Sequence, residues 1–198
     1  MTPSMRLILA SQSPRRRDLL RAAGFDFEIR PSRVEEGEPA PGEQPAEFAR
    51  NAARLKAQDV ASSSEPGSLV LGADTVVAVD GHILGKPSGP DDAARMLRLL
   101  SGRTHEVITG VCLVRAPSRE EALTHETTSV TFRELDEDEI RSYTQTGEPF
   151  DKAGGYAIQG LASRFVTCIS GCYFNVVGLP IPLIYDALKR ILKSVDDA

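Results

Sequence analysis

The stretch from Leu7 to Leu20 constrains the fold most strongly. Four consecutive apolar residues at 7–10 predict a short buried strand, and the polar residues after them predict a tight exit from that strand. Pro14 suits the first position of a helix, for which Ser13 would be the N-cap. The chain is therefore expected to begin with a strand that passes through a short turn directly into a helix.

Three arginines, Arg15 to Arg17, occupy the first turn of this helix. A helix N-terminus offers unpaired backbone N–H groups and the positive end of the helix dipole, so a purely structural helix more often carries Asp or Glu there. The pattern leaves two interpretations open, a binding site for a polyanion such as a phosphate chain or a solvated basic face. For a polyanion, Arg15 and Arg16 are favoured over Arg17, because three successive helical positions cannot all face one ligand.

Hydrophobic periodicity and turn signals predict a mixed α/β fold. Further helices are predicted at 46–61, 90–100, 136–146 and 181–193, and further strands at 25–30, 69–79, 82–84, 104–114, 122–133, 164–169 and 173–177. In the helix at 46–61 the spacing predicts a buried stripe of Phe48, Ala52, Leu55 and Val60. Lys56 lies next to that stripe, so its amine is expected either at the surface or in a cleft.

Asp74 interrupts the most apolar stretch of the chain, 69–79. An ionised carboxylate in such a strand is costly unless it is paired, binds a ligand or accepts backbone hydrogen bonds at a bulge, and we interpret Asp74 as functional. Asp80-Gly81 predicts a two-residue hairpin turn. The returning strand would bring Lys86 to the level of Asp74, where a lysine can contact a phosphate.

Two further loops carry candidate site residues. Glu35 and Glu36 lie in a Pro-, Gly- and Glu-rich loop at 31–45, where carboxylates are either solvated or available to hold a metal ion. The segment 148–160 is rich in glycine and polar residues, as is typical of loops that approach a ligand through their backbone.

Composition narrows the class of protein. The 198 residues are 41% hydrophobic, which suits a single domain over 1–198 with a substantial core. A net charge of -5 disfavours a nucleic acid polymer as partner, so any phosphate site must be a local basic focus. Because no apolar run approaches about 20 residues and the N-terminal apolar run is too short for a signal peptide, we expect a cytoplasmic protein without membrane contact.

Cysteine and histidine show no metal-binding spacing. Cys112, Cys168 and Cys172 fall in predicted strands, which favours small buried hydrophobic side chains in a reducing compartment. The sequence has no Cys-x-x-Cys and no closely spaced histidine pair, so a zinc site is not expected.

Five motifs in the chain together resemble the Maf family of nucleotide pyrophosphatases. They are Ser11-Gln-Ser-Pro-Arg-Arg, Gly72-Ala-Asp-Thr, Leu84-Gly-Lys-Pro, Leu100-Ser-Gly-Arg-Thr-His and Glu148-Pro-Phe-Asp-Lys-Ala-Gly-Gly-Tyr-Ala-Ile-Gln-Gly. The resemblance spans nearly the whole chain. It implies an elongated mixed β-sheet flanked by helices, with a cleft between two lobes as in inosine triphosphate pyrophosphatases, and it implies a homodimer.

The family reaction converts a nucleoside triphosphate to the monophosphate and pyrophosphate with the help of a divalent cation, either Mg, Mn or Co. By resemblance, Asp74 is the catalytic carboxylate, as proton acceptor for water or as metal ligand, and Glu35 is the second candidate ligand. The remaining residues that match the family's phosphate-facing and metal-facing positions are Ser11, Arg15, Arg16, Lys56 and Lys86.

Arg15, Thr75 and Gln159 match the specificity positions of the branch that acts on dTTP and UTP, not those of the branch that prefers 7-methyl-GTP. A glutamine amide can both donate to and accept from the edge of uracil or thymine, and modified pyrimidine nucleotides would fit as well. The chain has no tryptophan, so Tyr156 and Phe150 are the weaker candidates for base stacking. The alternative is a nucleotide-sensing regulator of cell division or septum formation that binds nucleotides without significant turnover.

Overall fold

The computed structural model describes residues 6–35, 37–117 and 120–196, with side chains as far as residue 191. Its centre is one seven-stranded mixed sheet in the order β2-β1-β3-β5-β6-β7, with β4 paired to β3. β1 pairs in parallel with β2 and β3, and the other pairs are antiparallel. The strands are β1 Leu7–Leu9, β2 Glu28–Ile29, β3 Leu69–Val79, β4 His82–Leu84, β5 Thr104–Arg115, β6 Glu121–Phe132 and β7 Val166–Ser170.

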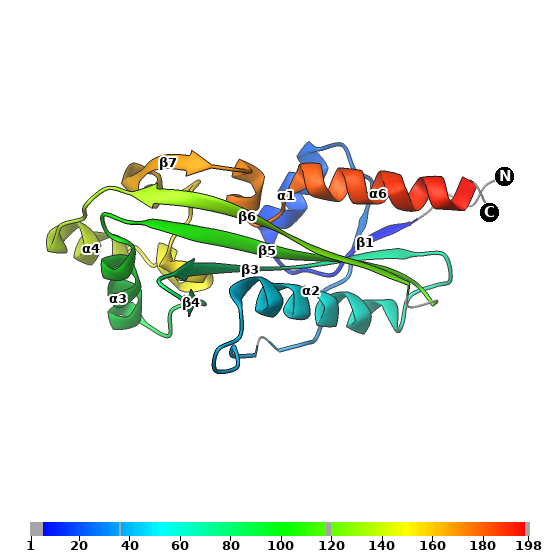
Figure 1. Ribbon diagram of the computed structural model, residues 1–198, viewed down its shortest axis with the longest axis horizontal. Coiled ribbons are helices and arrows are strands. Elements are labelled where there is room, and N and C mark those ends of the chain that lie inside the picture. Colours follow the sequence, from blue (N-terminus) through cyan, green and yellow to red (C-terminus); the bar gives the residue numbers. More distant parts are fainter. Residues whose placement is uncertain (1–5, 36, 118–119, 197–198) are drawn as a thin grey trace.

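Helices cover both faces of this sheet, and the molecule is elongated along β3, β5 and β6 (Figure 1). The helices are α1 Pro14–Ala22, α2 Pro45–Ala61, α3 Pro90–Leu100, α4 Glu137–Thr144, α5 Tyr173–Val177 and α6 Ile181–Asp196. Short 3₁₀ turns occupy Glu148–Asp151, Ala153–Gly155 and Leu161–Phe165. The mixed α/β fold with flanking helices is as predicted from the sequence. No helix in the described ranges is both long enough and apolar enough to span a bilayer.

The alternation of β3 divides the core. Leu69, Leu71 and Ala73 pack with α1 and α6 at one end of the molecule. Val77 and Val79 point to the same face but pack with α3, α4 and Phe132 at the other end. The even-numbered positions of β3, such as Val70, Val76 and Ala78, point to the opposite face, which α2 covers. One face of the sheet therefore carries two separate apolar cores, and these form the two lobes.

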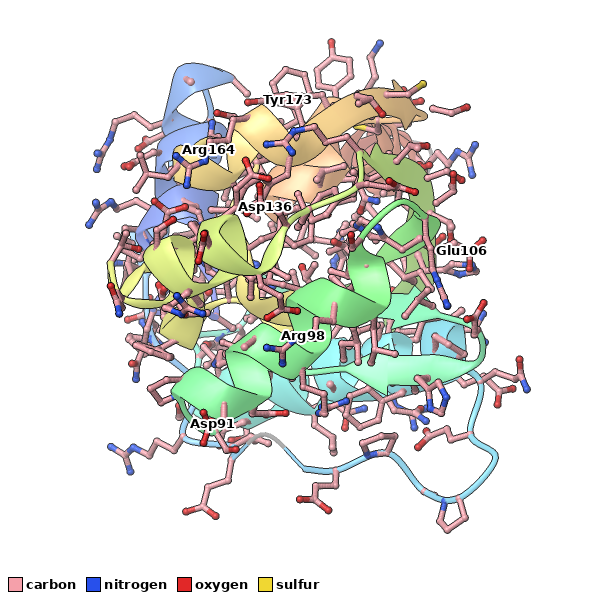
Figure 2. All side chains as sticks on the ribbon, turned by 90° about the vertical axis from the view of Figure 1, so that its left-hand side faces the viewer. Asp91, Arg98, Glu106, Asp136, Arg164 and Tyr173 are labelled. Atoms are coloured by element: carbon pink, nitrogen blue, oxygen red, sulfur yellow. The ribbon has the colours of Figure 1, made fainter. Side chains whose placement is uncertain are left out.

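The second lobe is closed by α3 and α4. Figure 2 shows this end of the molecule, with Asp91 and Arg98 along the outer side of α3 and Asp136 at the start of α4. Arg98 Nη2 lies 2.7 Å from Glu137 Oε2, so an exposed ion pair joins the two helices. Asp136 caps α4 through its side chain and Glu139 completes a capping box, which is why this helix begins where the sequence predicts.

Two glycines let α2 lie directly on the sheet. A Cβ atom on Gly72 would be 2.2 Å from the Ala53 carbonyl oxygen, and one on Gly110 would be 2.2 Å from the Ala49 carbonyl oxygen. Because the helix backbone approaches so closely, only small side chains fit between the two layers. The buried positions of α2 are Ala49, Ala53, Lys56, Ala57, Val60 and Ala61.

The predicted buried stripe of α2 was therefore wrong except at Val60. Phe48 and Ala52 are only half-buried, and Leu55 is exposed. The larger apolar side chains flank the contact because the glycines of β3 and β5 select alanine at its centre.

The segment 173–177 is the other clear difference, since the predicted strand is the helix α5. The ladder between β6 and β7 ends at the pair Ser129 and Ser170, and the chain then turns through Gly171. The backbone N–H groups of Asn175 and Val176 bond the Cys172 carbonyl, which starts a helical turn. Cys172 is consequently the N-cap of a helix and half-buried, and Cys168 is exposed, so only Cys112 has the predicted buried environment.

We expect Gly72→Ala to lower the free energy of unfolding by about 1–3 kcal/mol, because the new methyl group must displace the backbone of α2. Equilibrium denaturation measures the change. Gly37→Ala is the matched control, since nothing lies within 4 Å of a Cβ atom there. Equal denaturation midpoints for the two variants would show that α2 moves away from β3 at little cost.

Candidate active site

A cavity of about 1090 Å³ opens where one edge of β3 loses its partner strand. β1 pairs with residues 69–71 of β3 and β4 pairs with residues 77–79, and none of the described strands covers 72–76 on this edge. The cavity therefore lies between the two lobes. Its lining includes the predicted site residues Ser11, Arg15, Arg16, Glu35, Lys56, Asp74, Thr75, Lys86 and Gln159. Glu36, the other candidate carboxylate of the loop at 31–45, lies outside the described residues.

On the α2 face of the sheet, the cavity wall contains a buried ion pair. Lys56 Nζ lies 2.6 Å from Asp74 Oδ1, and the two residues are 9% and 8% exposed. The register of β3 against β5 is unbroken around Asp74, so the carboxylate does not sit at a β-bulge. The amine of Lys56 reaches into the cleft, which was one of the two alternatives for this residue. An ion pair held this far from bulk water keeps the carboxylate in one position at the cavity wall.

On the opposite face, Arg16 forms a clamp around the open edge of β3. Its Nε donates to the Gly178 carbonyl at 2.9 Å, and its Nη1 donates to the Ala73 carbonyl at 2.8 Å. Its Nη2 donates to Thr75 Oγ1 at 3.0 Å, and Nη1 also bonds Ser11 Oγ at 3.4 Å. The guanidinium thus joins α1, β3 and the turn after α5, and most of its donors are used within the protein.

The other two arginines of this turn have different surroundings. Arg15 lines the cavity, and its Nη1 lies 3.4 Å from Asp151 Oδ2. Burial favours a higher pKa for Asp151, but the hydrogen bond and the charge of Lys152, together with the charge of Arg15, outweigh it and lower the pKa. Arg17 bonds its neighbour Asp18 at the surface and is not part of the cavity lining. This arrangement agrees with the expectation that Arg15 and Arg16, not Arg17, face the site.

The segment 152–160 forms the far wall and is held by its glycines. Gly154 has φ +68° and packs against Val77, where a Cβ would meet the valine methyl at 2.9 Å. Its N–H donates to the Gly85 carbonyl at 2.9 Å, which ties this wall to the residue before Lys86. Gln159 is exposed at the cavity rim.

Glu148 anchors the end of the segment 152–160 through contacts that the sequence did not reveal. Its carboxylate accepts from the Leu161 N–H at 3.0 Å and from the Tyr143 hydroxyl at 3.0 Å. Neither contact follows the period of a helix or a strand, so the periodicity of the sequence gave no signal for them.

His105 is a second contact that sequence reasoning missed. The ring is 1% exposed, and its Nε2 lies 2.7 Å from the Tyr156 hydroxyl oxygen. Burial lowers the pKa of His105 to about 4, so the ring is neutral at pH 7. Tyr156 is itself buried and packs edge-on against Phe132, so it forms part of the wall and not an open platform for stacking. Phe150, the other predicted stacking candidate, does not line the cavity.

The acidic residues limit which metal sites are feasible. Within the described ranges no group of three or more His, Cys, Asp or Glu side chains could enclose a metal ion. Asp74 and Glu35 both line the cavity, however, and Mg²⁺ is commonly held by one or two carboxylates together with substrate phosphates and water. The donor set therefore fits a cation that arrives with a phosphorylated ligand. Burial raises the pKa of the Cys112 thiol to about 12, which makes it an unsuitable metal ligand.

Fold and cavity together define an α/β protein with a cleft lined by both polar and apolar side chains, built around a strand end, a helix N-terminus and a buried Lys–Asp pair. The family profile described as "Maf-like protein" matches residues 6–191. This chain belongs to the Maf family.

Its relatives include a protein from Koribacter versatilis named dTTP/UTP pyrophosphatase, which is 54% identical over 94% of each chain. A protein of the same name from Thermococcus gammatolerans is 50% identical over 90% of this chain and 93% of its own length. A dITP/XTP pyrophosphatase structure from Mycobacterium abscessus is similar with a TM-score of 0.42 and 16% identity, over 66% of this chain and 76% of its own.

We expect Arg16→Lys to reduce the free energy of unfolding by about 1–3 kcal/mol, since an ammonium group cannot span the Gly178, Ala73 and Thr75 acceptors that the planar fork reaches. Arg17→Lys, one position along, should change it by less than about 0.5 kcal/mol. Urea denaturation of both variants measures this. If the two variants lose equal stability, the bonds of Arg16 to β3 and to the turn after α5 do not stabilise the fold.

His105 should make stability depend on pH. An unfolded histidine titrates near pH 6.5 and the folded one near 4, so the unfolded state binds the extra proton and stability falls as pH decreases through this window. We expect wild type to lose about 2 kcal/mol from this residue between pH 7.5 and pH 5, and His105→Gln to lack that loss. Denaturation at both pH values, with the exposed His82→Gln as control, measures the difference. An identical slope for wild type and His105→Gln would contradict the assignment.

Proposed function

We propose that this protein is a nucleoside triphosphate pyrophosphatase that hydrolyses dTTP and UTP, and modified pyrimidine nucleotides, to the monophosphate and pyrophosphate. The observation that carries the proposal is the Asp74 carboxylate, held by Lys56 in the wall of a cavity that also contains a helix N-terminus and arginine side chains. The relatives named dTTP/UTP pyrophosphatase, at 46–54% identity over most of the chain, support the same reaction and substrates.

The two faces of β3 suggest where each part of the substrate binds. The lining on the α2 face carries the charged groups of Lys56, Asp74 and Glu35, which suit a triphosphate with a cation. The lining on the other face combines the apolar side chains of Val107, Tyr156, Ile158 and Val176 with the polar side chains of Thr75 and Gln159, and Arg16 bonds Thr75 from beside them. An apolar pocket with a few polar groups suits a nucleobase. In our proposal the nucleotide crosses the open edge of β3 between the two subsites.

The reaction requires water to attack the α-phosphorus. In our proposal Asp74 accepts a proton from this water while the new P–O bond forms, and the bond from the α-phosphorus to the bridging oxygen breaks. Pyrophosphate leaves with the electron pair of that bond. Lys56 keeps the carboxylate in place, and Lys86 and Arg15 neutralise charge on the phosphate oxygens.

A divalent cation, Mg, Mn or Co, would neutralise further charge on the triphosphate, and Asp74 and Glu35 are the side chains that we propose as its ligands. If Asp74 acts as a metal ligand, its proton-acceptor role passes to another group. The two roles differ in metal dependence, because replacement of a ligand raises the metal concentration needed for half-maximal activity.

The alternative, a nucleotide sensor without turnover, fits the site less well. A protein that only binds nucleotides needs hydrogen-bond donors and positive charge for the phosphates, whereas a carboxylate fixed at the cavity wall can also accept the proton of an attacking water. The placement of Asp74 therefore favours catalysis.

Release of pyrophosphate from dTTP, UTP, CTP, GTP and 7-methyl-GTP tests the proposal. We expect dTTP and UTP to be the best substrates, and Asp74→Asn to lower kcat by about 10²-fold to 10⁴-fold because it removes the proton acceptor. Asp80→Asn, at the exposed hairpin turn, is the control and should keep full activity. We expect Gln159→Glu to lose the pyrimidine preference, since a carboxylate cannot donate a hydrogen bond to the base.

Two outcomes would contradict the proposal. Tight binding of dTTP without release of pyrophosphate would favour the sensor, and full activity of Asp74→Asn would leave the carboxylate with a structural role. A titration of Asp74→Asn with Mn²⁺ separates the two catalytic roles, because excess metal restores activity only where Asp74 is a ligand.

A further inference from the structure

We propose that Thr109, which lies outside the cavity lining, is a positioning residue that turns the hydroxyl of Thr75 into a hydrogen-bond acceptor for the nucleobase. The inference rests on the proposed function and concerns how the same site discriminates between pyrimidines. Thr109 is on β5 directly opposite Thr75 of β3, and its side chain is fully buried.

The contacts form a chain that runs from the cavity into the sheet. Arg16 Nη2 donates to Thr75 Oγ1 at 3.0 Å, and the two threonine hydroxyl oxygens are 2.9 Å apart. Thr109 Oγ1 donates to the Asn175 carbonyl at 3.3 Å. Thr75 lines the cavity, so the chain connects a ligand-facing hydroxyl to a fully buried carbonyl.

Only one proton can lie between the two threonine oxygens. If Thr109 donates to Asn175, Thr75 must donate to Thr109. The opposite polarity would leave Thr75 to donate to the Gly178 carbonyl at 3.5 Å, a carbonyl that already accepts from Arg16. The first arrangement has the shorter bonds, 2.9 and 3.3 Å, so it is favoured.

The acceptor at the end of this chain is itself held in place. The Asn175 side-chain amide donates to the Val107 carbonyl at 2.8 Å and to Thr128 Oγ1 at 3.0 Å. Asn175 is fully buried, so α5 cannot shift relative to β5 without breaking these bonds. The proton of Thr109 therefore has a fixed partner.

The consequence for the ligand follows from counting donors and lone pairs. The Thr75 hydroxyl uses its proton on Thr109 and one lone pair on Arg16, so it presents only its second lone pair to the cavity. Uracil and thymine carry an N–H at ring position 3, whereas cytosine carries an unprotonated nitrogen there. In our proposal the free lone pair of Thr75 faces ring position 3, where it accepts from the N–H of uracil and thymine and offers no donor to the nitrogen of cytosine. Without Thr109, the Thr75 hydroxyl rotates and can serve either base.

Two substitutions separate the hydroxyl of Thr109 from its packing. Thr109→Val keeps the shape and removes the hydroxyl, and Thr109→Ser keeps the hydroxyl and removes a methyl group. We expect Thr109→Val to lower the ratio of kcat/KM for UTP over CTP by about fivefold to tenfold, the effect of one hydrogen bond. Thr109→Ser should stay within about twofold of wild type. Thr144→Val, at another buried threonine whose hydroxyl bonds within α4, is the control and should leave the ratio unchanged.

The same ratio should be measured as binding, with UTP and CTP analogues that carry a methylene bridge between the α- and β-phosphorus. An unchanged ratio in Thr109→Val, or an equal loss in Thr109→Ser, would overturn the inference, since packing would then explain the effect. If wild type binds the uridine analogue more tightly than the cytidine analogue but releases no pyrophosphate from UTP, the proposed function fails. The binding ratio of the variants then still decides the role of Thr109. If wild type binds both analogues equally, the inference is overturned.

Discussion

Among the described strands, β1 and β4 pair with one edge of β3 at its two ends and leave the middle of that edge without a partner strand, and the rest of the molecule depends on that interruption. β5 pairs with the other edge without a break from Leu69 to Ala78, so the strand continues across the gap. Because β1 and β4 stop short of each other, the two lobes are separated and the middle of β3 borders the cavity. The side chains of Asp74 and Thr75 then project to opposite faces at the same point.

Contacts on both faces of the sheet fix the groups along this open edge. Arg16 covers the Ala73 carbonyl and fastens α1 to the turn at Gly178. On the other face, Gly72 and Gly110 let α2 approach so closely that Lys56 reaches Asp74 from the adjacent layer. A helix held farther from the sheet by larger side chains would carry the Lys56 ammonium away from the carboxylate. The glycines of the core thus determine the geometry of the proposed catalytic pair.

Polar groups that never touch the cavity also shape it. His105 bonds the hydroxyl of Tyr156 from behind the cavity wall, and Glu148 joins Tyr143 of α4 to Leu161, at the end of the segment that carries Gln159. These contacts were invisible in the sequence because each joins residues whose separation follows no strand or helix period.

The homodimer and the cation that the family resemblance implies stay predictions.

The sequence by itself determined the order of the main helices and strands and the hairpin at Asp80-Gly81. Local signals sufficed there, because periodicity, caps and turn residues act over a few positions. Thr75 and Gln159, which line the cavity, were indicated only by the family motifs and not by local signals. Only the tertiary structure decided that 173–177 is helical, that alanines form most of the buried face of α2, and that Arg16 donates hydrogen bonds to groups of the protein itself. Each of these depends on a partner distant in sequence: the end of the β6–β7 ladder, the glycines of the sheet, and the carbonyl oxygens at the open edge of β3.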